Sequence, residues 1–143
     1  MKAPNSTHLP AISGLLAANG LPTDDLDALD LSWFLMREAD GAIEVVGGLE
    51  PCGHTALIRS VATAPSLRGR GLARALVLAL EHSATRRGLD ELYLLTETAE
   101  GFFSRLGYVT RERDLVPEPI RTSRQFSTLC PASATVMCKR LDP

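Results

Sequence analysis

Apolar residues recur at helical spacing near the start of the chain and then fall into short extended runs. Four of them predict a helix from about Thr7 to a stop at Gly20: Leu9, Ile12, Leu15 and Leu16. Three strand-like runs follow at 32–38, 42–49 and 54–63, and Asp40-Gly41 between the first two is a strong hairpin signal. Gly47-Gly48 in the second run indicates a bulge or a close backbone approach. These runs predict an antiparallel meander.

The order of elements changes after residue 63. A loop over 67–73 enters a helix whose apolar face has helical spacing: Leu72, Ala75, Leu76, Ala79 and Leu80. The pattern then predicts a strand at 91–96, a short helix at 99–106, a strand at 108–112, a short helix at about 117–128 and a closing strand at 134–141. We therefore expect a single α/β (α+β) domain over 1–143, with a mixed, mostly antiparallel central sheet flanked by helices.

Composition and charge exclude several classes of protein. Apolar residues make up 45% of the 143 residues, enough for a core, and the net charge of −2 is too low for a general nucleic-acid or membrane-surface binder. Three cysteines, Cys52, Cys130 and Cys138, fit no CxxC pattern, and no signal peptide or apolar run of membrane length is present. We expect a cytoplasmic protein with no nucleic-acid or membrane partner. The three histidines lack ligand spacing, which predicts no metal site.

Arginine dominates the basic residues. Thirteen of the fifteen are arginines, and nine of these lie between Arg59 and Arg113. The planar guanidinium fork suits phosphates and carboxylates. A solvated, arginine-rich surface is the alternative interpretation for most of them, and both stay open.

The segment Arg68-Gly69-Arg70-Gly71-Leu72-Ala73 predicts an anion-binding turn between a strand and a helix. The first N–H groups of a helix lack intrahelical partners, and the helix dipole adds about half a positive charge there. Two glycines let phosphate oxygens approach the backbone, and Arg74 adds a further charge one turn later.

Three phosphate-binding patterns can be compared with this turn. A Walker A loop needs GxxxxGK[ST], and no lysine or hydroxyl follows here. A dinucleotide fingerprint needs GxGxxG, but Arg74 stands at the third glycine position, and the turn follows the third strand of a meander. The pattern R/Q-x-x-G-x-G/A matches throughout. A glycine turn that binds nothing remains the alternative.

That third pattern is the acetyl-CoA turn of the GNAT superfamily of N-acetyltransferases, which the whole chain resembles. The resemblance implies acetyl-CoA as cosubstrate, held where the strand before the turn splays from the strand after the helix. It implies backbone pairing of the pantetheine with Val61, Ala62 and Thr63, and binding of the diphosphate by the turn. Phe102 is similar to the aromatic residue of the family's second coenzyme motif.

Two narrower resemblances concern the acceptor. The stretch 92–103 is similar to N-acetylglutamate synthase acetyltransferase domains. The stretches 129–134 and 21–23 are similar to bacterial arsenic-resistance N-acetyltransferases, one of which acts on arsinothricin, a glutamate analogue. Both resemblances imply transfer of an acetyl group to the amine of a small, amino-acid-like acceptor.

The sequence departs from the family at the proton donor. The family's usual tyrosine position is Phe103, and the glutamate base of histone acetyltransferases is replaced by Leu57. The catalytic residues are therefore unknown from sequence. Thr96, Ser104 and Glu97 are weak candidates, the hydroxyls for orienting a water, with local capping as the alternative. A backbone donor near Val61 could stabilise the oxyanion.

Arg59 is the strongest predicted acceptor residue. Strand alternation puts it on one face with Leu57, Val61 and Thr63, the family's active-site face, where a guanidinium could hold a carboxylate in a bidentate fork. A structural ion pair is the alternative. Arg37 is a second candidate, with a solvent-facing position as the alternative.

Two other functions stay open: acetylation of a protein lysine or N-terminus, and binding of coenzyme A without catalysis. The first and last strands could close the sheet or pair with a second chain, which leaves a homodimer open. Cys130 and Cys138 could contact arsenic, with buried apolar packing as the alternative.

Overall fold

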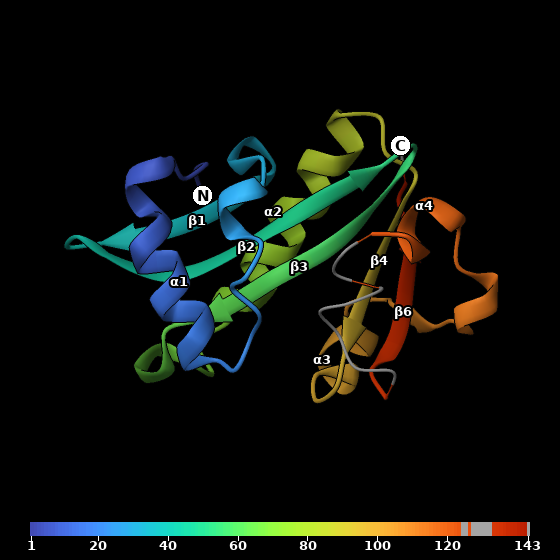
Figure 1. Cartoon of the computed structure of the whole chain (residues 1–143). Coiled ribbons are helices and arrows are strands. Elements are labelled where there is room, and N and C mark those ends of the chain that lie inside the picture. Colours follow the sequence, from blue (N-terminus) through green and yellow to red (C-terminus); the bar gives the residue numbers. More distant parts are fainter. Residues whose placement is uncertain (124–125, 127–132, 143) are drawn as a thin grey trace. The chain divides into compact units, whose positions relative to one another are not determined.

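The computed structural model describes residues 1–123, 126 and 133–142. Among these residues, six strands form a mixed sheet in the order β1-β2-β3-β4-β6-β5, flanked by helices as predicted (Figure 1). The chain divides into two compact units. Unit 1 contains Met1–Glu50 and Ser60–His82, and unit 2 contains Pro51–Arg59 and the chain from Ser83 onward.

The three strands of the predicted meander lie mostly in unit 1, while Pro51–Arg59 belongs to unit 2. Strands β1 (Phe34–Ala39) and β2 (Ala42–Cys52) pair antiparallel, and β3 (Thr55–Thr63) follows in the sheet. Asp40 and Gly41 between β1 and β2 have φ of 53° and 78°, the positive values that a type I′ hairpin turn requires. The hairpin prediction is confirmed.

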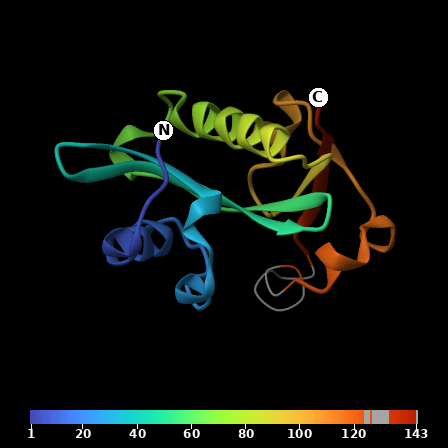
Figure 2. The ribbon, with the colours of Figure 1, turned by 90° about the horizontal axis from the view of Figure 1, so that it is seen from above.

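Two helices cover opposite faces of the strands in unit 1 (Figure 2). Helix α1 (Leu9–Ala18) buries Ile12 and Leu16 in a cluster with Met36, Val46 and Ala62 from the three strands. The other face lies under the first part of α2 (Leu72–Arg86), where Leu76 and Leu80 are fully buried. The predicted buried face of α2 is wrong at Ala75, which is exposed. The residues that complete the buried face are Val77 and Ala84.

The glycine pair in β2 marks a close approach, and its pairing with β1 is regular. A Cβ on Gly47 would lie 2.6 Å from Cδ2 of Leu76, and one on Gly48 would lie 2.5 Å from the Phe34 ring. The register shift of the hairpin lies between Arg37 and Glu38 of β1 instead. Glycine is therefore needed in β2 so that both faces of the strand can pack closely.

Unit 2 contains the other half of the sheet. Strand β4 (Glu91–Thr96) pairs in parallel with Thr55–Leu57 of β3 and antiparallel with β6 (Thr135–Arg140). Helix α3 (Glu100–Arg105) follows β4, and α4 (Glu118–Arg121) buries Ile120 against Leu57 and Tyr93. No helix in the described part of the chain has the length and apolar character to cross a membrane.

Two predicted elements of unit 2 differ from the structure. The predicted strand at 108–112 is reduced to β5 (Val109–Thr110), which pairs with β6. The predicted helix at 117–128 is described only as α4, and most of 122–128 beyond it lies outside the described residues. The short helix that Thr23 was predicted to cap is a 3-10 turn at Leu26–Ala28. The 3-10 turns at Leu31–Trp33 and Arg113–Leu115 were not predicted, because three residues are too few for a periodic pattern.

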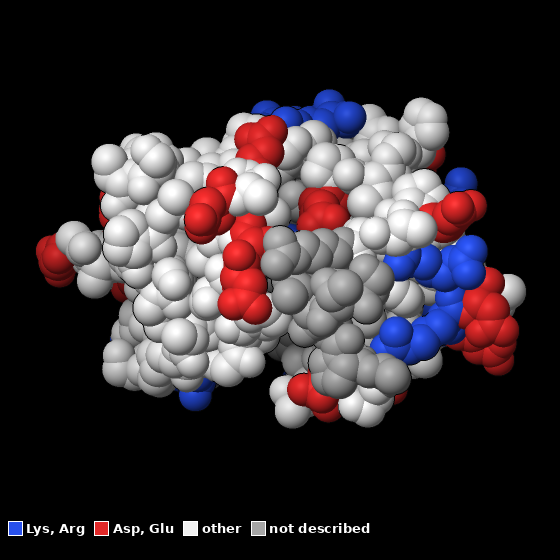
Figure 3. Space-filling model, in the orientation of Figure 1, with Lys and Arg blue, Asp and Glu red and all other residues white. Residues whose placement is uncertain are grey.

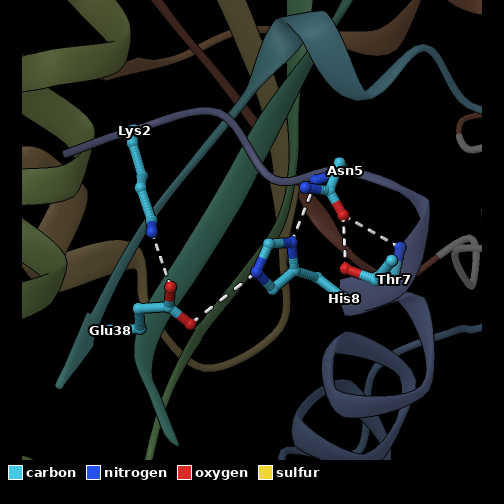
Figure 4. A network of polar contacts seen from close by, with 5 residues as sticks. All are labelled: Lys2, Asn5, Thr7, His8 and Glu38. Atoms are coloured by element: carbon cyan, nitrogen blue, oxygen red, sulfur yellow. Dashed lines mark hydrogen bonds and ion pairs between the residues drawn. The ribbon is translucent and has the colours of Figure 1, made fainter. Parts of the chain in front are cut away.

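A polar network ties the N-terminus to β1 (Figure 4). Lys2 pairs with Met36 through backbone hydrogen bonds, and its Nζ lies 2.6 Å from Oε1 of Glu38. Nε2 of His8 lies 3.7 Å from the other carboxylate oxygen, while its Nδ1 accepts a hydrogen bond from the Asn5 backbone. The Lys2 hydrogen bond is the main cause that lowers the pKa of Glu38 below its ordinary value.

The Glu38 carboxylate predicts a pH-dependent contribution to stability. Because its pKa is lowered in the folded state, its contribution is present above the ordinary value of 4.5 and is lost as the pH falls through the folded value. We expect Glu38→Gln to lower the thermal midpoint at pH 7 and to match the wild type in strong acid. Lys2→Ala should show the same convergence, and a midpoint difference that persists below pH 3 would contradict this role.

Candidate functional site

The glycine turn of unit 1 has the geometry of an anion cradle. Gly69 and Gly71 have φ of 81° and 79°, and a Cβ at either would meet no protein atom within 4 Å. The carbonyl of Gly71 accepts from the Ala75 N–H at 3.0 Å, so α2 begins directly after the second glycine. The two glycines therefore leave space beside the turn at the N-terminus of a 15-residue helix, whose first N–H groups lack intrahelical partners.

Three arginines surround the cradle. Arg68, Arg70 and Arg74 are all exposed, and Leu72 and Ala73 form the half-buried start of α2. The Nη2 of Arg68 donates to Oδ1 of Asn19 at 2.8 Å. The turn thus combines helix N–H groups, two glycines and exposed positive charge, the combination that suits a diphosphate.

The end of β3 enters the turn with a break in strand alternation. Ser60 has φ of 60°, which is uncommon for a residue with a side chain. After it, Val61 lies beside Leu76 of α2, whereas Ala62 lies in the cluster under α1. Alternation therefore cannot be carried from Leu57 through Ser60 to Val61 and Thr63, and that part of the prediction is wrong.

The other predicted site residues of unit 2 lie on β3, β4 and α3. Arg59 is only 3% exposed, a rare degree of burial for arginine, and it follows Leu57 at the interval that keeps two residues on one face. Phe102 is half-buried at the start of α3. Ser60, with its positive φ, therefore lies between Arg59 and the strand end that leads into the glycine turn.

The catalytic candidates have local roles or are exposed. Oγ1 of Thr96 accepts a hydrogen bond from the Ala99 N–H at 2.9 Å, which is the capping role given as its alternative. Ser104 and Glu97 are exposed. Phe103 is buried and packs edge-on against Phe102 and Tyr108, with ring centroids 5.0 and 5.5 Å away. The family's tyrosine position is therefore occupied here by a phenylalanine, whose ring packs against other aromatic rings of unit 2.

Arg37 of β1 carries a charge that is already paired. Its Nε lies 3.2 Å from Oε1 of Glu44 on the neighbouring strand, and 59% of the Arg37 side chain is exposed. The solvent-facing alternative describes this position well.

Two polar residues near the predicted sites had no signal in the sequence. Asn19 contacts Arg68 across 49 positions, a separation that no local pattern reveals. Tyr93 of β4 is buried beside Cys138, and its hydroxyl donates to Glu91 Oε1 at 3.3 Å. Burial, helped by the Glu91 charge, raises the pKa of Tyr93 above its ordinary value. Its hydroxyl therefore keeps its proton at neutral pH.

The cysteines and acidic residues form no metal site within the described residues. No group of three histidine, cysteine, aspartate or glutamate side chains gathers there. Cys138 is buried in the cluster with Tyr93, Cys52 is half-buried, and Cys130 lies outside the described part of the chain. Apolar packing describes Cys138 well.

Charge is unevenly distributed on the surface. In Figure 3, acidic side chains gather over the segment between α1 and β1, where Asp24, Asp27 and Asp30 are exposed. Basic side chains gather around α4, which contains Arg121, and around the loop before it, which contains Arg113. The acidic segment therefore belongs to unit 1 and this basic group to unit 2.

Known proteins match this chain in sequence. A family model described as an acetyltransferase (GNAT) domain matches residues 30–110. Mouse N-alpha-acetyltransferase 80 is 37% identical over 79 residues, which are 52% of this chain and 23% of the mouse protein. An acetyltransferase of Yersinia enterocolitica is 28% identical over 103 residues, covering 68% of this chain and 72% of its own length.

Solved structures match the fold over nearly the whole chain. N-acetylglutamate synthase of Neisseria gonorrhoeae, complexed with coenzyme A and N-acetyl-glutamate, has a TM-score of 0.84 at 19% identity. The match covers 100% of this chain and 35% of that enzyme. Rv2747 of Mycobacterium tuberculosis, in complex with CoA and NLQ, has a TM-score of 0.81 at 23% identity and is covered to 98%, as is this chain.

Proposed function

Because the chain belongs to the GNAT family of acetyltransferase domains, we propose that it transfers the acetyl group of acetyl-CoA to the amine of a small acceptor that carries a carboxylate. The family and the fold were both predicted from the sequence, and the family model and the structural neighbours confirm them. The chain spans about a quarter of the length of the mouse relative and about a third of the length of the synthase.

One observation carries the proposal: the open glycine turn at the N-terminus of α2. Its two glycines have positive φ, and a Cβ added to either would meet no atom within 4 Å. A long helix follows directly, and exposed arginines flank the turn. Backbone N–H groups of 69–73 would bind the diphosphate of the coenzyme, and Arg68, Arg70 and Arg74 would neutralise its charge. Val61, Ala62 and Thr63 of the adjoining strand would pair with the pantetheine.

The transfer requires few side chains once the reactants are oriented. The neutral amine attacks the thioester carbonyl, the new C–N bond forms, the C–S bond breaks, and the thiolate receives the proton that the amine loses. A backbone N–H near Val61 would stabilise the oxyanion, because the Ser60 kink takes this backbone out of the regular strand. Water can relay the proton from the amine to the thiolate, whose solution pKa is near 8.5, so the absence of a tyrosine at Phe103 does not forbid turnover.

The acceptor class rests on Arg59. A guanidinium has five N–H donors in a fixed fork, so it can bind a carboxylate bidentately while it keeps another partner. Its burial strengthens such a bond, because water competes less. The synthase and Rv2747 neighbours are described with N-acetyl-glutamate and NLQ, which favours an amino-acid-like acceptor. An acceptor of the arsinothricin type and an arsenic-resistance role remain predictions, as do a cytoplasmic location, a homodimer and a single domain over 1–143.

Replacing Arg59 tests the acceptor. We expect Arg59→Ala to raise the acceptor KM by about 10- to 100-fold, the value of one or two charge-assisted hydrogen bonds, and to leave the Kd for coenzyme A within twofold. Steady-state kinetics and calorimetry measure the two quantities. Arg37→Ala is the comparison: its guanidinium is already paired with Glu44, so we expect a smaller change. Equal losses for both substrates in Arg59→Ala would exclude a specific acceptor role.

The proposed reaction is tested by thiol release. Purified protein and acetyl-CoA are incubated with a panel of amino acids, glutamate analogues and short peptides, and free coenzyme A thiol is measured against acceptor-free controls. Turnover with glutamate-like amines supports the proposal. Binding of acetyl-CoA without turnover on any acceptor would instead indicate a coenzyme-binding module without catalysis.

A second function is favoured by one observation. The exposed aspartates at positions 24, 27 and 30 would attract a basic protein tail, and the mouse relative is named an N-alpha-acetyltransferase. Acetylation of a protein N-terminus or lysine would then replace the small acceptor. In the same panel, turnover on basic peptides that exceeds turnover on glutamate analogues would select this function.

A further inference from the structure

The residue that caps the C-terminus of α1, Asn19, contacts the coenzyme turn of unit 1 through its side chain. Nδ2 of Asn19 donates to the carbonyl of Leu15 at 2.9 Å and to that of Thr63 at 3.2 Å. Oδ1 of the same amide accepts from Nη2 of Arg68 at 2.8 Å. A single amide therefore joins the C-terminus of α1, the last residue of β3 and the first arginine of the glycine turn.

The chemistry of these partners fixes the orientation of the amide. Two of the groups are carbonyls, which only accept, and the third is a guanidinium, which only donates. The NH₂ of Asn19 must face the carbonyls, and its oxygen must face Arg68. An aspartate could hold the guanidinium, but it has no donor for Leu15 or Thr63. The site thus requires a side-chain amide and not merely a polar residue.

We propose that Asn19 is a positioning residue for acetyl-CoA, which orients Arg68 toward the diphosphate and holds the Thr63 carbonyl at the end of the pantetheine strand. The proposal rests on the proposed function of the turn. Arg68 is exposed on a long side chain, so it would lose rotamer freedom when it binds a phosphate. The hydrogen bond to Asn19 restrains the side chain beforehand and uses one of five N–H donors.

A double-mutant cycle on coenzyme binding tests the coupling between the two side chains. The Kd for coenzyme A is measured by calorimetry for the wild type, Asn19→Ala, Arg68→Ala and the double variant. We expect each single substitution to weaken binding about 5- to 10-fold and the double variant to be no weaker than about 10-fold, because both remove the same contact. Arg74→Ala is the control partner, and its effect should multiply with that of Asn19→Ala.

Kinetics separate positioning from a merely structural role. Asn19→Ala should raise the KM for acetyl-CoA and change kcat by less than twofold, whereas loss of fold alone would lower the active fraction and leave the KM unchanged. If Asn19→Ala shows no cooperative thermal transition, Asn19→Ser takes its place in the cycle. Its shorter hydroxyl can still donate to the carbonyl four residues earlier but cannot replace the amide toward Arg68.

The outcomes distinguish this inference from the proposed function. A wild-type protein that does not bind coenzyme A overturns the function of the turn, and with it the premise. A wild type that binds, together with Asn19 and Arg68 effects that multiply, overturns only the positioning role. Losses that fail to multiply, with a raised KM for acetyl-CoA, support it.

Discussion

Gly71→Asp should remove coenzyme A binding while the protein stays folded. The new carboxylate would lie at the N-terminus of α2, where it would occupy the position of a phosphate and take up the same N–H groups. If two charge-assisted hydrogen bonds of about 1.5 kcal/mol each are lost, the Kd rises at least about 100-fold. Calorimetric titration with coenzyme A measures this change, and Gly71→Ala, which adds bulk without charge, should have a smaller effect.

The hairpin offers a matched control for this substitution. Gly41 has φ of 78°, against 79° for Gly71, and a Cβ at either position would meet no atom within 4 Å. Gly41→Asp therefore suffers the same backbone strain, about 1–2 kcal/mol, at a place far in sequence from the turn. We expect Gly71→Asp to lower the thermal midpoint no more than Gly41→Asp does, because an acidic residue favours a helix start. Normal coenzyme binding by Gly71→Asp would be incompatible with the proposed cradle.

The parts of the fold that the sequence predicted well are those fixed by local backbone chemistry. Asp40-Gly41 can adopt positive φ cheaply, so the hairpin follows from two residues. Gly69 and Gly71 likewise adopt positive φ in the coenzyme turn. The class of ligand that this turn binds could be predicted from the local sequence alone. The antiparallel pairing of β1 with β2 follows from the same two-residue connection.

The parts that the sequence missed depend on contacts between distant residues. Ser60 has a conformation that its residue type disfavours, and its surroundings must hold it there, so strand alternation misplaced Val61 and Thr63. Asn19 sits at the end of a helix, where an asparagine is ordinary, and only the folded chain brings it to Arg68. The glycine turn was therefore predicted, whereas the residue that contacts its first arginine was not.

Gly48→Ala should have the largest effect on stability. The added Cβ would lie 2.5 to 2.6 Å from three atoms of the Phe34 ring, which is 1% exposed and cannot yield by rotating a flexible chain end. Overpacking of this kind costs about 1–3 kcal/mol, and the rigidity of the ring favours the upper part of that range. We expect the thermal midpoint to fall by roughly 10 °C, with little change in the Kd for coenzyme A measured below the transition.

Two further variants show whether the collision with Phe34 is the cause. Gly14→Ala, in α1 with no neighbour within 4 Å, should stabilise the protein by about 0.5–1 kcal/mol, since alanine is the better helix former. Phe34→Leu should destabilise the wild type but partly rescue Gly48→Ala, because the smaller side chain leaves room for the new methyl group. If the two substitutions were additive in the double variant, strain at Phe34 could not be the reason that β2 requires glycine at this position.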